Sequence, residues 1–324
     1  MAVAGGLAAM TATSPRAAAA AGSGSNRAEA QPGRPLNQAR LQPQFCPIAP
    51  TANVSAIVSH RKSMRGASMR GASMRSAEVV PGLHRLGGIG GVNAYLWLPQ
   101  PGQSSPGEAI LFDCGWPWSG RDLTASLADL GCGPADLRAI AITHGDFDHA
   151  GPLAALITHG HVEIIAHELE APRLASGQWR TLPGNGASFD PMILAAGPAY
   201  RLWPPRPVQV TRPIQDGAEI GDGWIAVHTP GHTAGHTAFF HPATKVLIAG
   251  DALGSERRGH LRLPKRIYAE DWEASLRSVR KLADLQPEVI CFGHGRELHQ
   301  ASGLLQALAG SLSAEKSYSK VGGL

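Results

Sequence analysis

The residues best suited to chemistry in this sequence are histidines and aspartates gathered in one short segment. Thr143 is followed by the run His-Gly-Asp-Phe-Asp-His, which places four possible metal ligands within six residues, 144–149. The run follows an apolar segment, 137–143, whose pattern indicates a buried strand. Side chains on a turn that leaves a strand can converge on one point, and imidazole with carboxylate is a common ligand set for zinc or iron. The sequence therefore predicts a metal centre at this turn.

Histidine and aspartate recur later in the chain at equivalent places, each after a strand-like segment and beside a small residue. His232 and His236 lie on a Gly/Pro turn after residues 224–228. Asp251 follows one apolar segment and Gly250, and His294 follows another and Gly293. Glycine allows a backbone to approach a site closely. The repeated order of strand, small residue and ligand indicates that these side chains belong to one centre.

Taken in order, these residues resemble the metallo-β-lactamase fold superfamily. That family is marked by an aspartate after an early strand, an HxHxDH turn, a later GH, a GD after a strand and a terminal GH. The counterparts here, in order, are Asp113, residues 144–149, His232, Asp251 and His294. The resemblance covers roughly residues 79–300. It implies an α/β protein with a four-layer αββα sandwich, and a hydrolase in which a hydroxide bridging two metal ions attacks the substrate.

The resemblance also implies which residues hold the two metal ions. The expected ligands are His144, Asp146 and His232 for one ion, Asp148, His149 and His294 for the other, and Asp251 bridging both. Asp148 is in addition the expected catalytic residue, because it would hold and orient the hydroxide. Asp113 would accept a hydrogen bond that orients a ligand, and His236 would support its turn without ligating.

Position 146 departs from the commonest pattern of the family, because it is aspartate and not histidine. A carboxylate is shorter and harder than imidazole and adds a negative charge. Zinc is the expected metal, but this exchange favours Mn²⁺ or Fe²⁺ relative to the usual ligand set. If Asp146 does not ligate, a mononuclear iron oxygenase of the persulfide dioxygenase kind, on the same fold, is the alternative. A metal-binding protein without turnover is a third hypothesis.

The elements that would position these residues follow from hydrophobic periodicity. Strand-like and helix-like segments alternate, with helices expected at 121–130, 271–285 and near 304–312. Residues 173–213 contain seven prolines and are expected to form a long irregular loop or lid. Neither a GxGxxG nor a GxxxxGK[ST] phosphate loop is present, which argues against a dinucleotide or P-loop enzyme.

Residues 1–77 differ in composition from the rest of the chain. They contain nine basic residues and one acid, a net +8, so that residues 78–324 carry −4 of the total charge of +4. Because this segment is rich in Ala, Ser, Gly and Arg, we expect a disordered leader, followed by the hydrolase domain at 78–324. One hypothesis is a later start, at Met64, Met69 or Met74. The other is a transit peptide, which would change the expected location from the cytoplasm to a plastid or mitochondrion.

Composition also limits the partners. The acidic body argues against nucleic acid, and no segment approaches the ~18 apolar residues of a membrane span. Four cysteines without a CxxC pair argue against a disulfide framework or a cysteine zinc site. The expected partner is a small-molecule ester, lactone or thioester, in part because the long C-terminal helical domain of glyoxalase II relatives is missing. The oligomeric state stays unknown.

Some residues outside the ligand set are candidates for substrate contact. An anionic group of the substrate would meet cations among Arg257, Arg258, Lys265 and Arg266, and Tyr268 would polarise a carbonyl group. The aromatic residues Trp179 and Trp203 would belong to the lid. For each of these residues, a solvated or packing role is the competing interpretation.

Overall fold

The computed structural model describes residues 76–87, 89–99, 109–159, 161–178, 202, 204, 206–256 and 260–321, with side chains of the last helix described as far as residue 312. All of these residues belong to one compact unit, Gly66–Leu324. The expectations for residues 1–75, for Trp179 and Trp203, and for Arg257 and Arg258 lie outside the described residues. Within the described part of the chain, no helix is long and apolar enough to cross a membrane.

The first sheet has seven strands, hydrogen-bonded in the order of the sequence. They are β1 (Ala77–Val80), β2 (Leu83–Arg85), β3 (Tyr95–Trp97), β4 (Ala109–Phe112), β5 (Leu137–Ala141), β6 (Glu163–His167) and β7 (Arg212–Ile214). Neighbours are antiparallel from β1 to β4 and parallel from β4 to β7. Parallel neighbours need crossover connections. These contain α2 (Gly120–Asp129) with η2 (Pro134–Asp136), α3 (Leu153–Leu156) with η3 (Ile157–His159), and α4 (Ala171–Ser176).

The second sheet has six strands in the order β15-β14-β11-β10-β9-β8. In chain order they are β8 (Glu219–Gly221), β9 (Trp224–His228), β10 (Thr237–His241), β11 (Val246–Gly250), β14 (Val289–Phe292) and β15 (Leu298–His299). All neighbours are antiparallel except β11 and β14, which are parallel and connected through α6 (Trp272–Asp284). The other described elements are the hairpin of β12 (Gly254–Ser255) and β13 (Leu261–Arg262), the short helix η4 (Arg266–Tyr268) and the helix α7 (Ser302–Val321).

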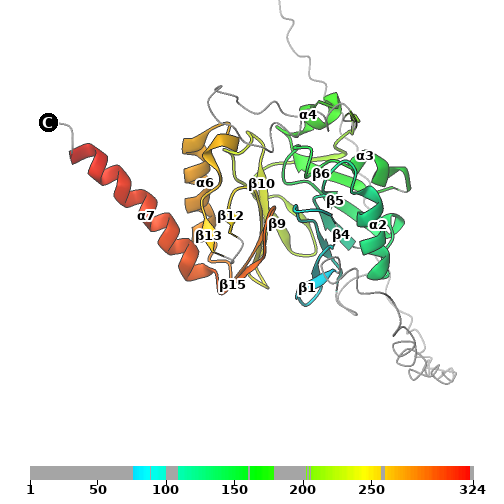
Figure 1. The fold of residues 1–324 in the computed structure, drawn as a ribbon, viewed down its shortest axis with the longest axis horizontal. Helices are drawn as coiled ribbons and strands as arrows, with labels where there is room; N and C mark the ends of the chain where they lie inside the picture. Colours follow the sequence, from blue (N-terminus) through cyan, green and yellow to red (C-terminus); the bar gives the residue numbers. More distant parts are fainter. Residues whose placement is uncertain are drawn as a thin grey trace, which may run out of the picture. The chain divides into compact units, whose positions relative to one another are not determined.

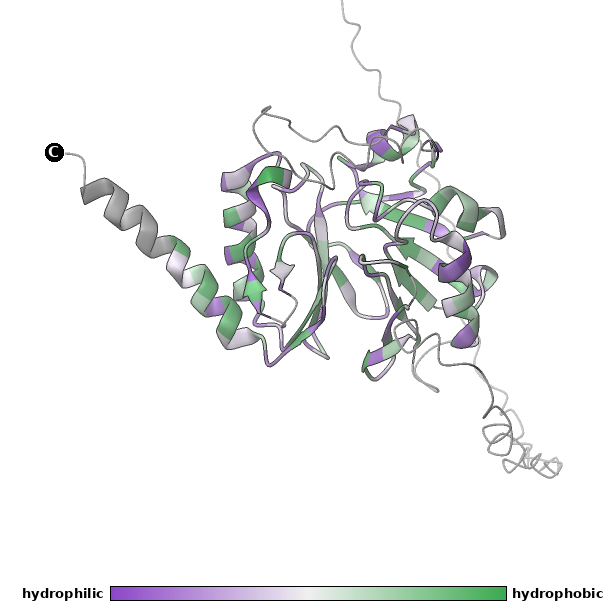
Figure 2. Ribbon diagram, in the orientation of Figure 1, coloured by the Kyte–Doolittle hydropathy of each residue, from purple (hydrophilic) through white to green (hydrophobic). Residues whose placement is uncertain are grey.

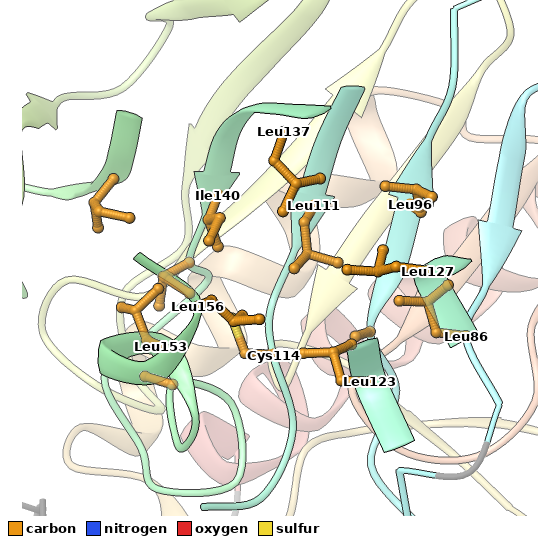
Figure 3. Close-up of a cluster of buried hydrophobic side chains, with 14 of the residues drawn as sticks. Leu86, Leu96, Leu111, Cys114, Leu123, Leu127, Leu137, Ile140, Leu153 and Leu156 are labelled. Carbon is orange, nitrogen blue, oxygen red and sulfur yellow. The ribbon is translucent and has the colours of Figure 1, made fainter. Parts of the chain in front are cut away.

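Three buried apolar clusters show how these elements are layered. The first lies between the two sheets and includes Phe112, Trp224 and Phe239. The second lies on the outer face of the first sheet, where Leu111 of β4 and Leu123 of α2 belong to the same buried cluster (Figure 3). The third joins the second sheet to α6 and α7. The two sheets therefore lie face to face with helices on both outer sides (Figure 1), which confirms the αββα fold.

Alternation along the strands produces this layering, because successive side chains point to opposite faces of a sheet. In β4, Ile110 and Phe112 face the other sheet, whereas Leu111 faces the helices. Helix α6 buries one face, which includes Val279 and Leu282. Figure 2 shows the result, with apolar residues along the strands and hydrophilic residues on much of the outer helices.

The elements expected from the sequence agree with this fold in most places. The helices expected at 121–130 and 271–285 correspond to α2 and α6. The prediction of an irregular segment over 173–213 is wrong at both ends, because α4 continues to Ser176 and β7 begins at Arg212. Both elements are too short to show a periodic pattern, and β7 is defined by its pairing with β6.

Candidate metal centre

The seven predicted ligands come together where strands of both sheets end. In chain order they follow β5 (His144, Asp146, Asp148 and His149), β9 (His232), β11 (Asp251) and β14 (His294). Strand β5 belongs to the first sheet and the other three strands belong to the second. All seven side chains are buried or half-buried. The centre is therefore assembled from both halves of the sandwich.

Two sets of three residues each place one ligand atom apiece within 4.8 Å of one another. Group one consists of His144, Asp146 and His232, and group two of Asp148, His149 and His294. In group one, the Oδ2 atom of Asp146 lies 3.2 Å from Nε2 of His232 and 3.5 Å from Nε2 of His144. In group two, Nε2 of His294 lies 3.4 Å from Oδ2 of Asp148.

Asp251 lies between the two groups. Its Oδ1 atom is 3.5 Å from Nε2 of His149, which belongs to group two. Its Oδ2 atom is 3.7 Å from Nε2 of His232 in group one and 3.6 Å from Nε2 of His294 in group two. A third set of nearby ligand atoms, from His144, His149 and Asp251, overlaps both groups. A carboxylate in this place can bridge two ions.

Unpaired nitrogens show that these residues fit metal ions. The Nε2 atoms of His144 and His149 are buried without a hydrogen-bond partner among the described residues. The other ring nitrogens are already engaged, since Nδ1 of His144 lies 3.0 Å from Oγ1 of Thr143, and Nδ1 of His149 lies 2.8 Å from Oδ2 of Asp113. A buried polar atom without a partner is costly, and a divalent ion bound at each Nε2 would remove that cost.

Asp113 connects the turn after β5 with a ligand of group two. Its Oδ1 atom accepts a hydrogen bond from the N–H of Thr143 at 2.8 Å, and its Oδ2 atom accepts one from the Thr143 hydroxyl at 2.8 Å. Oδ2 also faces Nδ1 of His149, so that this nitrogen carries the proton and Nε2 is left for a metal. Asp113 has φ of 55°, a conformation that aspartate tolerates better than most residues.

His236 uses both ring nitrogens within the protein. Its Nδ1 atom lies 2.8 Å from the hydroxyl oxygen of Thr229, and its Nε2 atom accepts a hydrogen bond from the N–H of Asp251 at 3.0 Å. Burial, followed by the nearby rings of His144 and His232, lowers the pKa of His236 well below its ordinary value. The neutral ring therefore holds the backbone at Asp251 in place.

The carboxylates keep two of the histidines charged in the absence of metal. Burial opposes the charged form of His149, but Asp113, Asp251 and Asp148 together raise its pKa to about 10. Against the same effect of burial, Asp251 and Asp148 raise the pKa of His294 to about 9. These histidines in turn hold the pKa of Asp251 far below its ordinary value. A metal ion entering at neutral pH would therefore displace protons.

A cavity of about 210 Å³ opens onto the centre. Five of the predicted ligands line it, and its remaining wall includes Arg262, Lys265 and Tyr268 with the apolar side chains of Phe147 and Leu253. The ammonium group of Lys265 lies over the Tyr268 ring, 5.2 Å from its centroid. Sequence patterns did not single out Arg262, which reaches the cavity from the hairpin β12–β13.

The described cysteines do not offer a competing nucleophile. Cys114, Cys132 and Cys291 are buried and not in disulfides. Burial raises the pKa of Cys114 and Cys291 and raises that of Cys132 to about 11. Because the reactive form is the thiolate, these side chains stay unreactive at neutral pH.

Sequence reasoning missed two charged residues that contact the centre. Glu170 is 1% exposed and hydrogen-bonded to the turns that carry group one. Arg173 lies one helical turn later, with Nη1 3.9 Å from Oδ1 of Asp146. The only signal in the sequence was that Glu170 follows a strand-like segment, as the ligands do, and that signal is weak for a lone glutamate.

Comparison with known proteins agrees with this geometry. A family model described as the metallo-beta-lactamase superfamily matches residues 87–294. The probable metallo-hydrolase YflN of Bacillus subtilis (strain 168) is 30% identical over 207 residues, which cover 59% of this chain and 77% of YflN. The hydroxyacylglutathione hydrolase of Cereibacter sphaeroides (strain ATCC 17029 / ATH 2.4.9) is 33% identical over 142 residues, which cover 43% of this chain and 47% of that protein. Among solved structures, the metallo-beta-lactamase family protein TTHA1429 from Thermus thermophilus is 26% identical, with a TM-score of 0.51, and the match covers 73% of this chain and 81% of that chain.

Proposed function

Because this chain belongs to the metallo-beta-lactamase superfamily, we propose that it hydrolyses a small-molecule ester, lactone or thioester with two divalent metal ions. Zinc is the proposed metal, with Mn²⁺ and Fe²⁺ as alternatives. The observation that carries the proposal is the convergence of groups one and two on a single cavity, with two buried nitrogens left unpaired among them. Hydrolysis is also the activity in the names of the relatives YflN and hydroxyacylglutathione hydrolase.

The side chains of this cavity are suited to hydrolysis. Divalent ions held by groups one and two would polarise a substrate carbonyl group and lower the pKa of water. Asp148 lines the cavity, and its carboxylate is held beside Nε2 of His294 at 3.4 Å. It would accept a hydrogen bond from the attacking water and so orient that water toward the carbonyl carbon. Phe147 and Leu253 would shield the reaction from bulk solvent.

The cationic side chains in the cavity wall support a substrate with an anionic group. Arg262 and Lys265 line the cavity, and neither has an acidic partner within 4.0 Å among the described residues. The cavity is small, since its volume of about 210 Å³ lies below the roughly 300–1,000 Å³ of pockets that hold drug-sized ligands. We therefore favour a short acyl group that carries a carboxylate or another anion, with the leaving group reaching toward solvent.

Elemental analysis combined with a panel of small esters, lactones and thioesters tests the hydrolase. We expect about two metal ions per chain, and turnover that disappears on chelation and returns when metal is added back. One iron per chain with consumption of O₂ would replace the hydrolase by a mononuclear oxygenase. Bound metal without turnover of any ester, lactone or thioester would contradict an enzyme of this substrate class.

A matched pair of esters tests the anionic substrate. We compare 4-nitrophenyl butyrate, which is neutral, with mono(4-nitrophenyl) succinate, which carries a carboxylate on a chain of similar length. Arg262→Gln and Lys265→Gln should each raise KM for the anionic ester about tenfold, the value of one charge-assisted hydrogen bond. KM for the neutral ester and the metal content should not change. Arg121→Gln, at an exposed position on α2, is the control. Equal KM values for the two esters would contradict the anionic subsite but not the proposed hydrolysis.

A further inference from the structure

A buried carboxylate outside the predicted ligand set connects the two turns that carry group one. Glu170 follows β6 and is 1% exposed. Its Oε2 atom accepts a hydrogen bond from the N–H of Gly145 at 2.9 Å, between the first two ligands of the group. Its Oε1 atom accepts one from the hydroxyl of Thr233 at 2.6 Å and one from the N–H of Gly235 at 3.2 Å, on the turn of the third ligand. One side chain thus joins both turns.

The two glycines leave room for this carboxylate. A Cβ atom on Gly145 would lie 3.0 Å from Oε2 of Glu170 and 3.3 Å from Cδ of Arg173. A Cβ atom on Gly235 would lie 2.8 Å from Cγ of Glu170 and 2.9 Å from its backbone nitrogen. Both distances at Gly235 are shorter than the contacts that Cβ atoms make in proteins, so a side chain there would force the neighbouring atoms to move. The close approach of the turns to Glu170 therefore depends on glycine at these positions.

Arg173 provides the positive charge near this buried carboxylate. Its Nη1 atom lies 4.0 Å from Oε2 of Glu170 and 3.9 Å from Oδ1 of Asp146, and it is buried without a hydrogen bond in the described part of the chain. Its Nη2 atom donates a hydrogen bond to Oε1 of Glu270 at 3.0 Å. The guanidinium group is therefore placed among three carboxylates.

Asp146 directs its two oxygens to opposite partners. Oδ2 faces the ring of His232 at 3.2 Å, whereas Oδ1 faces Arg173. A histidine at position 146 would put a neutral ring beside the guanidinium group and would remove one of its three carboxylates. Because a charge in a partly buried position needs compensation, Arg173 suits a carboxylate at this position better than an imidazole.

We propose that Glu170 is a positioning residue, which sets the spacing of the ligands in group one, and that Arg173 is its counter-ion. In that role Arg173 also favours aspartate at position 146. The carboxylate of Glu170 bonds beside ligands of group one and has no hydrogen bond to a ligand of group two among the described residues, so we expect its influence mainly at the ion of group one. The inference rests on the metal binding proposed above, but on no substrate.

Metal titration of Glu170→Gln tests the positioning role. This isosteric change keeps one acceptor oxygen but turns an NH₂ group toward a backbone or hydroxyl donor. Competition with a chromophoric chelator for Zn²⁺ should show that one of two sites is weakened about 10- to 100-fold, as for other residues that orient ligands. The second site should keep its affinity, and the visible spectrum of Co²⁺ should change for one site only. Glu168→Gln, whose carboxylate is exposed and bound to Gln215, is the matched control.

A second background shows which site is affected. His232→Ala removes a ligand of group one, so Glu170→Gln should cause no further loss of affinity when the two changes are combined. The proposal would be overturned if Glu170→Gln weakened metal binding equally in the wild-type and His232→Ala backgrounds, or if it weakened both sites equally. Either result would mean that Glu170 only supports the fold. If Glu170→Gln does not fold, Thr233→Val removes one of the three hydrogen bonds and should weaken the same site to a smaller extent.

The counter-ion is tested in the metal-free protein. Arg173→Met should lower the thermal midpoint by about 5 °C or more, because it removes the guanidinium group beside the buried carboxylate of Glu170. The shift should be smaller when Asp146→His is also present, because one of the three carboxylates beside Arg173 is then absent, and Arg173→Lys should restore most of the stability. An equal shift in both backgrounds would refute the pairing with Asp146. If the wild-type protein binds no metal ion, the proposed function itself is contradicted. If Glu170→Gln binds two metal ions with unchanged affinity, only this inference is overturned.

Discussion

Asp113→Asn should weaken the metal ion of group two while leaving the fold largely intact. Asparagine tolerates the φ of 55° at this position, and its amide oxygen can still accept the N–H of Thr143. The amide NH₂ group, however, would face Nδ1 of His149, which in the native protein lies 2.8 Å from a carboxylate oxygen. An NH₂ donor there requires an unprotonated Nδ1, and the neutral ring then carries its proton on Nε2. That is the nitrogen predicted to bind metal.

The two consequences of this change differ in size. The Thr143 hydroxyl can turn and accept from the new NH₂ group, so the main loss is the charge-assisted hydrogen bond to His149. That loss costs about 2 kcal/mol of folding free energy, which corresponds to a fall in Tm of roughly 4–8 °C for a domain of this size. Metal affinity falls for two reasons. The His149 ring carries its proton on the nitrogen that should bind the ion, and the negative charge of Asp113 is lost. We therefore expect a 10- to 100-fold loss, or about 1.4–2.8 kcal/mol, at one site.

Chelator competition and thermal melting measure the two effects separately. The metal-free variant should melt as one transition a few degrees below wild type, and the loaded variant should bind one ion normally and the other weakly. Group one does not contain His149 and serves as the internal control. Unchanged affinity at both sites would refute the role assigned to Asp113, and so would an equal loss at both sites.

Three further predictions follow from the centre and from one surface ion pair. Asp148→Ala and His294→Ala should each abolish hydrolysis and reduce the metal content to about one ion per chain, with an unchanged circular dichroism spectrum; substantial activity in either variant would contradict group two. Asp146→His should shift competitive loading from Mn²⁺ toward Zn²⁺ without inactivating the enzyme, and an unchanged ratio of the two metals would mean that Asp146 is not a ligand. Although partial burial works the other way, the hydrogen bond from Lys281 lowers the pKa of Asp216 below its ordinary value of 3.8. The stability that this pair contributes should therefore be present above about pH 4 and be lost as pH falls through the lowered pKa. Since both side chains are about half exposed, Asp216→Asn should cost less than about 1 kcal/mol at pH 7 and progressively less as pH falls below about 4 in urea titrations, and a cost that does not change with pH would contradict this reasoning.

The sequence, through its resemblance to a known family, was sufficient for the fold class and for the residues that meet at the centre. Apolar runs at 137–143 and 246–248 predicted strands, and a 3.6-residue period over 271–285 predicted the helix that covers the second sheet in the structure. The His and Asp residues were recognisable because each stands directly after such a strand. These are local signals, carried by residues close together in the chain, so they can be read without the tertiary structure.

Only the tertiary structure showed what orients those residues. Glu170 contacts Gly145 across 25 positions of sequence and Thr233 across 63, and nothing in the spacing of a lone glutamate indicates either partner. The same is true of Arg262 in the cavity wall, which lies on a short hairpin without periodic pattern. The physical reason is that a buried charge is stabilised by donors and counter-ions from several distant segments, and their convergence exists only once both sheets have packed together.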